Sequence, residues 1–167
     1  MKHVFTARIV LRRAPEAVFP FFSDAGNLQR ITPPELRFRI LTPLPLEMRV
    51  GALIDYELRL FGAPFRWRTE ITHWDPPHAF TDVQLRGLYR EWVHTHRLRT
   101  VPGGTEIEDE VRYRLPLEPV GDLAYPIVRF QLARIFSYRQ RRIAEMLGGG
   151  SSAGRGPVAG PGPAASR

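Results

Sequence analysis

The chain of 167 residues is long enough for one domain with a core, and its 43% hydrophobic residues exclude a protein of disordered composition. It contains no cysteine, which excludes disulfides, thiolate nucleophiles and cysteine zinc sites and suits a reducing compartment. No apolar run approaches the ~20 residues that span a bilayer. The N-terminal residues alternate like a strand and lack the apolar core of a signal peptide. We therefore expect a cytoplasmic protein without a membrane span.

The formal net charge of +7 raises the question of a nucleic-acid partner. Arginine supplies every basic residue except Lys2, and most arginines alternate with acidic residues along predicted strands. Such interleaving is typical of a solvated sheet face, so we expect no nucleic-acid partner. A denser arginine group predicts a solvated helix face, with an anionic partner as the alternative. It comprises Arg129, Arg134, Arg139, Arg141 and Arg142.

The N-terminal part of the chain predicts one strand followed by two short helices. Residues 3–12 alternate with the period of a strand. Pro15 fits the first turn of a helix, where its missing N–H costs nothing, and apolar residues continue this helix to about residue 22. Residues 27–31 allow a second short helical turn, which Thr32-Pro33-Pro34 ends.

Six further short runs have the alternation of strands, and clusters of Gly and Pro separate them. They cover residues 37–41, 53–61, 65–74, 80–85, 91–101 and 105–115. Together with the first strand, they predict an antiparallel sheet of seven strands.

The last predicted element is a long amphipathic helix that begins near Pro126. Its apolar residues recur at spacings of three and four, namely Ile127, Val128, Leu132, Ile135, Ile143, Met146 and Leu147. From residue 148 the chain is mostly Gly, Pro, Ala and Ser, which cannot bury enough apolar surface to fold. We predict one domain over residues 1–147 and a disordered tail over 148–167. The predicted fold class is α+β, with a curved sheet that grips the long helix.

The strands at 91–101 and 105–115 are predicted to form a hairpin around Gly103-Gly104. A two-residue turn there would pair Arg99 with Glu108 and Arg97 with Glu110, placing opposite charges across the ladder. Because side chains alternate between faces, these charges face solvent. The other face carries Trp92, His94, His96, Asp109, Val111 and Tyr113. Aromatic and apolar groups with a few titratable ones are typical of a ligand pocket.

The element order and several short motifs resemble the helix-grip superfamily, also called START-like or Bet v 1-like (SRPBCC). The motifs are Ala14-Pro-Glu-Ala-Val-Phe-Pro-Phe-Phe-Ser-Asp24, Asn27-Leu28, Ile31-Thr-Pro-Pro34, Trp74-Asp-Pro-Pro77, Phe80-Thr-Asp82 and Trp92-Val-His-Thr-His96 before Gly104-Thr105. Over residues 3–147 the chain is similar to the bacterial polyketide cyclase/dehydrase and lipid-transport group. That resemblance implies a cavity between sheet and long helix, but a shared fold does not transfer a reaction.

Binding of a small hydrophobic molecule in this cavity is the main functional prediction. The ligand would be a polyketide, a lipid or an aromatic compound, held by aromatic walls on the strands and covered by the long helix. Tyr56, Leu58 and Leu60 are expected to pack beside Trp67. The predicted lining residues are Trp67, Trp92, His94, His96, Asp109, Val111, Tyr113, Ile127, Leu132 and Ile135.

His94 and His96 offer an alternative function, because histidine changes charge near neutral pH and suits acid–base catalysis. In the predicted register Tyr113 lies opposite His94, and Asp109 lies diagonal to His96. Asp109 would then orient an imidazole and Tyr113 would donate a hydrogen bond to a ligand carbonyl, as in a polyketide cyclase, aromatase or dehydratase. A hydrogen-bonded network without chemistry is the competing interpretation.

The two histidines also have the spacing of metal ligands on one strand face. A third ligand would have to come from Asp109, or from His73 if its strand is adjacent. No second motif such as His-Glu-x-x-His is present, so we predict neither a metal nor another cofactor. Asp82 and Gln84 share a face with Phe80, and the sequence leaves open whether it points inward. Exposed sheet edges would allow a homo-oligomer.

Overall fold

The computed structural model describes residues 1–117 and 120–148, so the predicted tail lies outside the described residues except for Gly148. The strands form one antiparallel sheet in the order β1-β7-β6-β5-β4-β3-β2. The predicted α+β class and the order of strand, two helices, six strands and long helix are confirmed. The elements are β1 (Lys2–Leu11), α1 (Pro15–Phe22), α2 (Asn27–Arg30), the 3-10 turn η1 (Pro34–Leu36), β2 (Arg39–Ile40), β3 (Leu53–Leu60), β4 (Ala63–Asp75), β5 (Ala79–Arg86), β6 (Glu91–Val101), β7 (Gly104–Arg114), the 3-10 turn η2 (Val120–Ala124) and α3 (Tyr125–Leu147).

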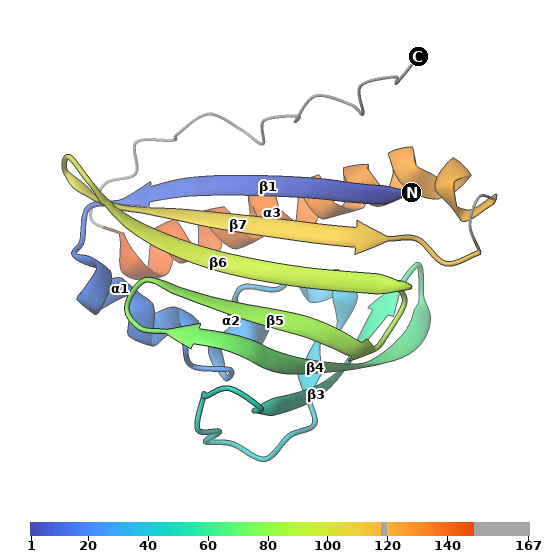
Figure 1. Ribbon diagram of the computed structural model, residues 1–167, viewed down its shortest axis with the longest axis horizontal. Helices are drawn as coiled ribbons and strands as arrows, with labels where there is room; N and C mark the ends of the chain where they lie inside the picture. Colours follow the sequence, from blue (N-terminus) through green and yellow to red (C-terminus); the bar gives the residue numbers. More distant parts are fainter. Residues whose placement is uncertain (118–119, 149–167) are drawn as a thin grey trace.

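The sheet curves, and α3 runs along it behind β1 and β7 (Figure 1). The short helices α1 and α2 follow the C-terminal end of β1, so they lie near the far end of the sheet from the N-terminus (Figure 1). None of the helices in the described part of the chain is long and apolar enough to cross a bilayer.

The edge strand β2 is shorter than the predicted run at 37–41. Arg37 has a φ of 44° and ends η1 in the left-handed conformation, so the strand can begin only after it. At its other end, the N–H groups of Leu41 and Thr42 both donate to the carbonyl of Asp55. Two donors on one carbonyl break the ladder, and only Arg39 and Ile40 pair with β3.

The predicted register of the β6–β7 hairpin is wrong by two residues. Val101 pairs with Gly104, so Pro102 and Gly103 form the turn, and Arg97 lies opposite Glu108. Gly103 has a φ of +89°, which suits glycine at this turn. Gly104 is required for a different reason: a Cβ there would lie 1.9 Å from the carbonyl oxygen of Leu11 on β1. An even shift leaves every side chain on its predicted face.

The long helix α3 presents a narrower buried stripe than predicted. Its buried side chains are Leu132, Phe136 and Ile143. Ile127 lies five residues before Leu132, about 140° around the helix at 100° per residue, and it is 60% exposed. Val128, four residues before Leu132, packs against the buried cluster instead. Ile127 therefore does not cover the sheet.

Two apolar clusters fill the interior. One contains residues of β1, α1 and the strands β3 to β7, together with Ile143 of α3. The other joins α3 to β1 and β7 and comprises Phe5, Ala7, Val111, Tyr113, Leu115, Leu132 and Phe136. Burying each large side chain stabilises the fold by roughly 1.5–3 kcal/mol, which fixes α3 against the sheet.

Candidate ligand-binding site

A cavity of about 170 Å³ lies between the sheet and α3. An apolar cavity of ~150 Å³ is already large enough to bind a benzene molecule. Strands β3 to β6 form its wall, α3 forms its opposite side, and the segment from α1 to η1 contributes most of the rest, with Phe38, Met48, Leu88 and Tyr89 from other loops. Its aromatic lining comprises Phe21, Phe22, Phe38, Tyr56, Trp67, Phe80, Tyr89, Trp92 and Phe136.

The aromatic side chains form an ordered wall. Tyr56 and Trp67 are stacked at 5.9 Å between ring centroids, and Trp67 and Trp92 meet edge to face at 5.4 Å. These pairs follow from the sheet, because Tyr56 on β3 lies directly opposite Trp67 on β4. Edge-to-face and offset pairs are the arrangements that aromatic quadrupoles favour.

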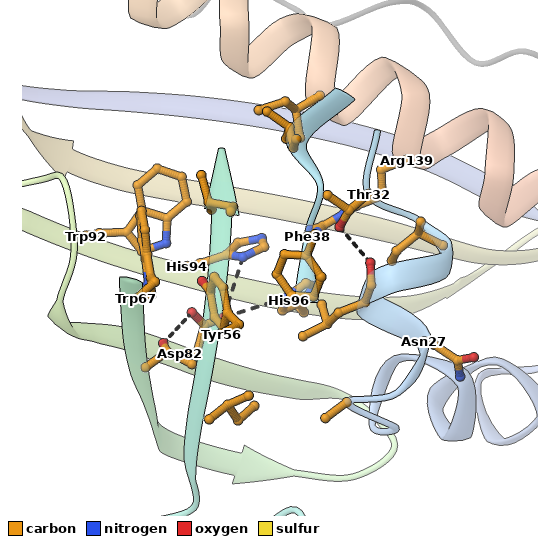
Figure 2. A pocket seen from close by; sticks show the side chains of 18 of the residues that line it. Asn27, Thr32, Phe38, Tyr56, Trp67, Asp82, Trp92, His94, His96 and Arg139 are labelled. Atoms are coloured by element: carbon orange, nitrogen blue, oxygen red, sulfur yellow. Dashed lines mark hydrogen bonds and ion pairs between the residues drawn. The ribbon is translucent and has the colours of Figure 1, made fainter. Parts of the chain in front are cut away.

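A polar network interrupts this wall at His94 and His96, whose ring centroids are 4.0 Å apart. One nitrogen of each ring contacts the same atom, Asp109 Oδ1, at 3.1 Å from His94 Nε2 and 2.7 Å from His96 Nδ1. The other nitrogen faces Asp82 Oδ1, at 3.5 Å from His94 Nδ1 and 3.9 Å from His96 Nε2. Figure 2 shows both imidazoles beside Asp82 and Tyr56. Each ring therefore lies between two carboxylates.

Sheet register explains how the four groups meet. Asp82 on β5 pairs with His94 on β6, and Asp109 on β7 pairs with His96. All four side chains point to the concave face of the sheet. The Thr69 hydroxyl on β4 lies 3.0 Å from Asp82 Oδ2 and 3.1 Å from the carbonyl oxygen of Val83, so these two acceptors share its proton, and Asp82 Oδ1 is left toward the rings.

Burial and neighbouring charges determine the protonation of the network. Burial raises the pKa of Asp109, but the charges and hydrogen bonds of His96 and His94 outweigh it and hold the pKa far below its usual range. Burial lowers the pKa of His96, His94 lowers it further, and the two carboxylates only partly oppose this. Asp109 is therefore ionised near pH 7 and His96 is neutral.

Two donors that line the cavity have no hydrogen-bond partner among the described residues. They are Trp67 Nε1 and Arg139 Nε, and both atoms are buried. A third buried nitrogen of the lining, His96 Nδ1, also makes no hydrogen bond of regular geometry, but it lies 2.7 Å from Asp109 Oδ1. The guanidinium of Arg139 lies 5.2 Å from the ring centre of Phe136, so it stays beside the cavity wall. Buried polar groups nearly always have partners, and an unpaired one calls for an explanation.

The predicted pocket residues fall into three groups. Trp67, Trp92, His94, His96, Leu132 and Ile135 line the cavity. Asp109, Val111 and Tyr113 are buried beside this wall, on β7, and are not among the lining side chains. Tyr113 pairs with Trp92, not with His94, and burial raises its pKa to about 12. Ile127 lies outside the cavity because of its position on α3.

Sequence reasoning did not identify three side chains that line the cavity. The sequence left open on which face of the sheet Asp82 lies, because only the pairing of β5 with β6 decides this. Phe136 was absent from the predicted stripe, although it lies four residues after Leu132, which is the helical signal that identifies it. Arg139 was assigned to a solvated face, whereas its side chain lines the cavity.

No family model matches the sequence, and no curated protein matches it. Solved structures do share the fold. The Zhui aromatase/cyclase from Streptomyces sp. R1128 has a TM-score of 0.70 at 13% identity, over 88% of this chain and 94% of that chain. Protein CV1439 from Chromobacterium violaceum has a TM-score of 0.67 at 18% identity, over 86% of this chain and 96% of that chain. Major latex-like protein 151 from Panax ginseng has a TM-score of 0.62 at 13% identity, over 87% of this chain and 97% of that chain.

The chain has the helix-grip fold. These likenesses, which include Bet v 1-like proteins, agree with the resemblance found in the sequence motifs. At such low identity they establish the fold alone, and the ligand and any reaction have to be argued from the site.

Proposed function

We propose that this helix-grip protein binds a small apolar molecule of one or two rings that carries an oxygen acceptor. The ligand would lie in the cavity between the sheet and α3. The free volume suits a ligand of this size, and the faces of Tyr56, Trp67 and Trp92 supply stacking surfaces.

The unpaired indole N–H of Trp67 is the observation that carries the proposal. Trp67 is 5% exposed, lines the cavity and finds no acceptor for Nε1 in the described part of the chain. A carbonyl or hydroxyl oxygen on the ligand would accept this hydrogen bond. Arg139 Nε could donate to the same kind of group from α3. An all-hydrocarbon ligand would leave both donors unpaired, which costs free energy.

Two matched probes, 2-naphthol and naphthalene, test the proposal by titration of tryptophan fluorescence and by calorimetry. We expect both to bind saturably, with 2-naphthol tighter by roughly 3–10-fold, the value of one hydrogen bond. Trp67→Phe should remove this preference while keeping the affinity for naphthalene. Trp74→Phe is the control, because Trp74 is not among the lining residues and packs against Phe19 and Phe80. Absence of saturable binding by either probe would contradict the proposal.

A second candidate function is ring closure or dehydration of a polyketide by acid–base catalysis. The observation that favours it is the position of His94 and His96 on the cavity wall, with Asp109 beside them on β7. A neutral imidazole held by a carboxylate can take a proton from the carbon beside a ketone and return it to an oxygen. Tyr113, the remaining member of the predicted catalytic set, lies opposite Trp92 on β7 and outside the cavity lining, so it would act only through packing.

Turnover of a linear poly-β-ketone by the His94→Ala and His96→Ala variants tests this second function. Loss of cyclised product in both variants, with retained binding of 2-naphthol, would support it. If both variants cyclise the substrate at the wild-type rate, the histidines are not catalytic and only the binding function remains.

A further inference from the structure

We propose that Asp82, His94 and His96 form a binding site for one divalent transition-metal ion of the Zn²⁺ and Fe²⁺ class on the cavity wall. The sequence predicted no metal, because it contains no second motif of metal ligands. Asp82, the proposed third ligand, lies on β5 and meets His94 through the pairing of β5 with β6. His73, considered as that ligand, is exposed on β4.

The spacing of the donor atoms suits a metal ion. One atom from each of the three side chains lies within 4.8 Å of the other two. Nitrogen and oxygen ligands bound at about 2.0–2.2 Å are roughly 3–3.5 Å apart around a zinc ion. Asp82 Oδ1 is already 3.5 Å from His94 Nδ1 and 3.9 Å from His96 Nε2. Small rotations of these side chains would complete the geometry.

Asp109 supplies the supporting carboxylate that metal-binding histidines commonly have. Its Oδ1 is hydrogen-bonded to His94 Nε2 at 3.1 Å and lies 2.7 Å from His96 Nδ1, outside regular hydrogen-bond geometry. Both of these ring nitrogens face away from Asp82. A carboxylate at this position keeps the imidazole proton on its own side and leaves a lone pair on the opposite nitrogen. Both lone pairs then point toward Asp82, which Thr69 holds in place through its other oxygen.

This convergence of acceptors requires a cation. Two imidazole lone pairs and one carboxylate oxygen meet in a site where His94 and His96 are 6% and 5% exposed. Groups of the same sign repel strongly away from water. Either an added proton or a metal ion would relieve the repulsion. A titration with Co²⁺ distinguishes these two cases.

The donor set also restricts the class of ion. Mg²⁺ and Ca²⁺ prefer oxygen ligands, whereas two imidazoles and one carboxylate suit Zn²⁺, or Fe²⁺ with open coordination positions. All three ligands line the cavity. The remaining coordination positions would therefore be filled by water or by an oxygen atom of a molecule in the cavity.

Titration of the full-length chain with Co²⁺ tests the site, since Co²⁺ replaces Zn²⁺ and absorbs visible light. The protein should carry no polyhistidine tag and should first be treated with a chelator. We expect one equivalent of Co²⁺ to bind with a saturable absorption band that Zn²⁺ displaces. Asp82→Asn should abolish this binding, and Asp109→Asn should weaken it by roughly 10–100-fold.

His73→Gln is the matched control and should bind Co²⁺ as the wild type does, because His73 lies outside the site. Asn at position 82 can still accept the Thr69 hydrogen bond, so we expect that variant to fold, as circular dichroism can check. If it does not fold, paramagnetic shifts of the His94 and His96 ring protons in wild-type protein decide the matter. Absence of one-equivalent binding, unshifted ring protons, or equal binding by Asp82→Asn would each overturn the proposal. The titration needs no organic ligand, so its outcome is independent of the proposed binding function.

Discussion

The two faces of the β6–β7 hairpin carry similar ionic groups in different surroundings. On the outer face, Glu108 accepts hydrogen bonds from Arg8 Nε at 2.7 Å and from Arg97 at 3.1 Å. On the inner face the next residue, Asp109, lies between the imidazoles of His94 and His96. Both carboxylates are buried, at 5% and 2% exposed.

The difference lies in how the charges are balanced. Glu108 meets arginines that remain charged at any physiological pH and whose side chains reach solvent. Asp109 and Asp82 share two imidazoles, one of which is neutral near pH 7. A buried ionic network contributes little to stability compared with apolar packing of the same volume. The buried carboxylate is therefore balanced by permanent charges on the outer face and by titratable rings on the inner face.

The largest expected effect is on the inner face. Asp109→Ala removes the carboxylate on which both rings depend and leaves buried N–H groups without an acceptor. We expect the free energy of unfolding to fall by about 3–5 kcal/mol, the usual cost of breaking a buried pair from one side. Urea denaturation followed by circular dichroism measures this. Asp109→Asn keeps an acceptor and should lose less; a loss below about 1 kcal/mol in the alanine variant would show that the network is not coupled to folding.

Glu108→Gln is expected to have an intermediate effect on the outer face, about 1–2 kcal/mol at pH 7. Burial raises the pKa of Glu108, but the hydrogen bond and charge of Arg8, with Arg97 and Arg99, lower it below its usual value. A lowered carboxyl pKa means that the ion pairs stabilise the fold fully above the unfolded pKa, about 4.3. Their contribution is lost as the pH falls through the folded pKa.

The difference in unfolding free energy between wild type and Glu108→Gln should therefore be constant from pH 7 to about pH 5 and shrink at lower pH. Glu106→Gln is the control, because Glu106 is on the same outer face of β7 and is less buried than Glu108. It should change stability by less than about 0.5 kcal/mol. If the difference grows toward acid pH, folding raises the pKa of Glu108 instead of lowering it, and the ionised carboxylate is not stabilised by its arginine partners.

The same hairpin shows how far sequence reasoning reaches. Period-two alternation assigned Trp92, His94 and His96 to one face correctly, because alternation depends only on local geometry. The register was wrong, because a Pro102-Gly103 turn and a Gly103-Gly104 turn both satisfy turn chemistry. What decides between them is the approach of β1, where Gly104 meets Leu11, and that contact is not local.

The site was predictable to the same extent. The position of the histidines on the cavity wall followed from alternation and from the order of the elements, and both can be recognised in the local sequence. The partners of the histidines did not, since Asp82 meets His94 only through the pairing of β5 with β6, which local alternation does not specify. The exposure of Ile127 was readable from helical geometry alone: adjacent residues such as Ile127 and Val128 cannot both lie at the centre of one buried stripe.

The smallest expected effect is at a solvent-exposed ion pair on the outer face, with which the buried ion pairs of Glu108 can be compared. Arg112 pairs with Glu110 at 2.8 Å, but its side chain is 62% exposed. Water screens such a pair and the long side chain loses conformational freedom in making it, so Arg112→Ala should cost less than about 1 kcal/mol. Urea denaturation at low and high salt measures this small loss and its screening. A loss as large as that of Glu108→Gln would show that burial of the carboxylate is not what separates strong from weak pairs on this face.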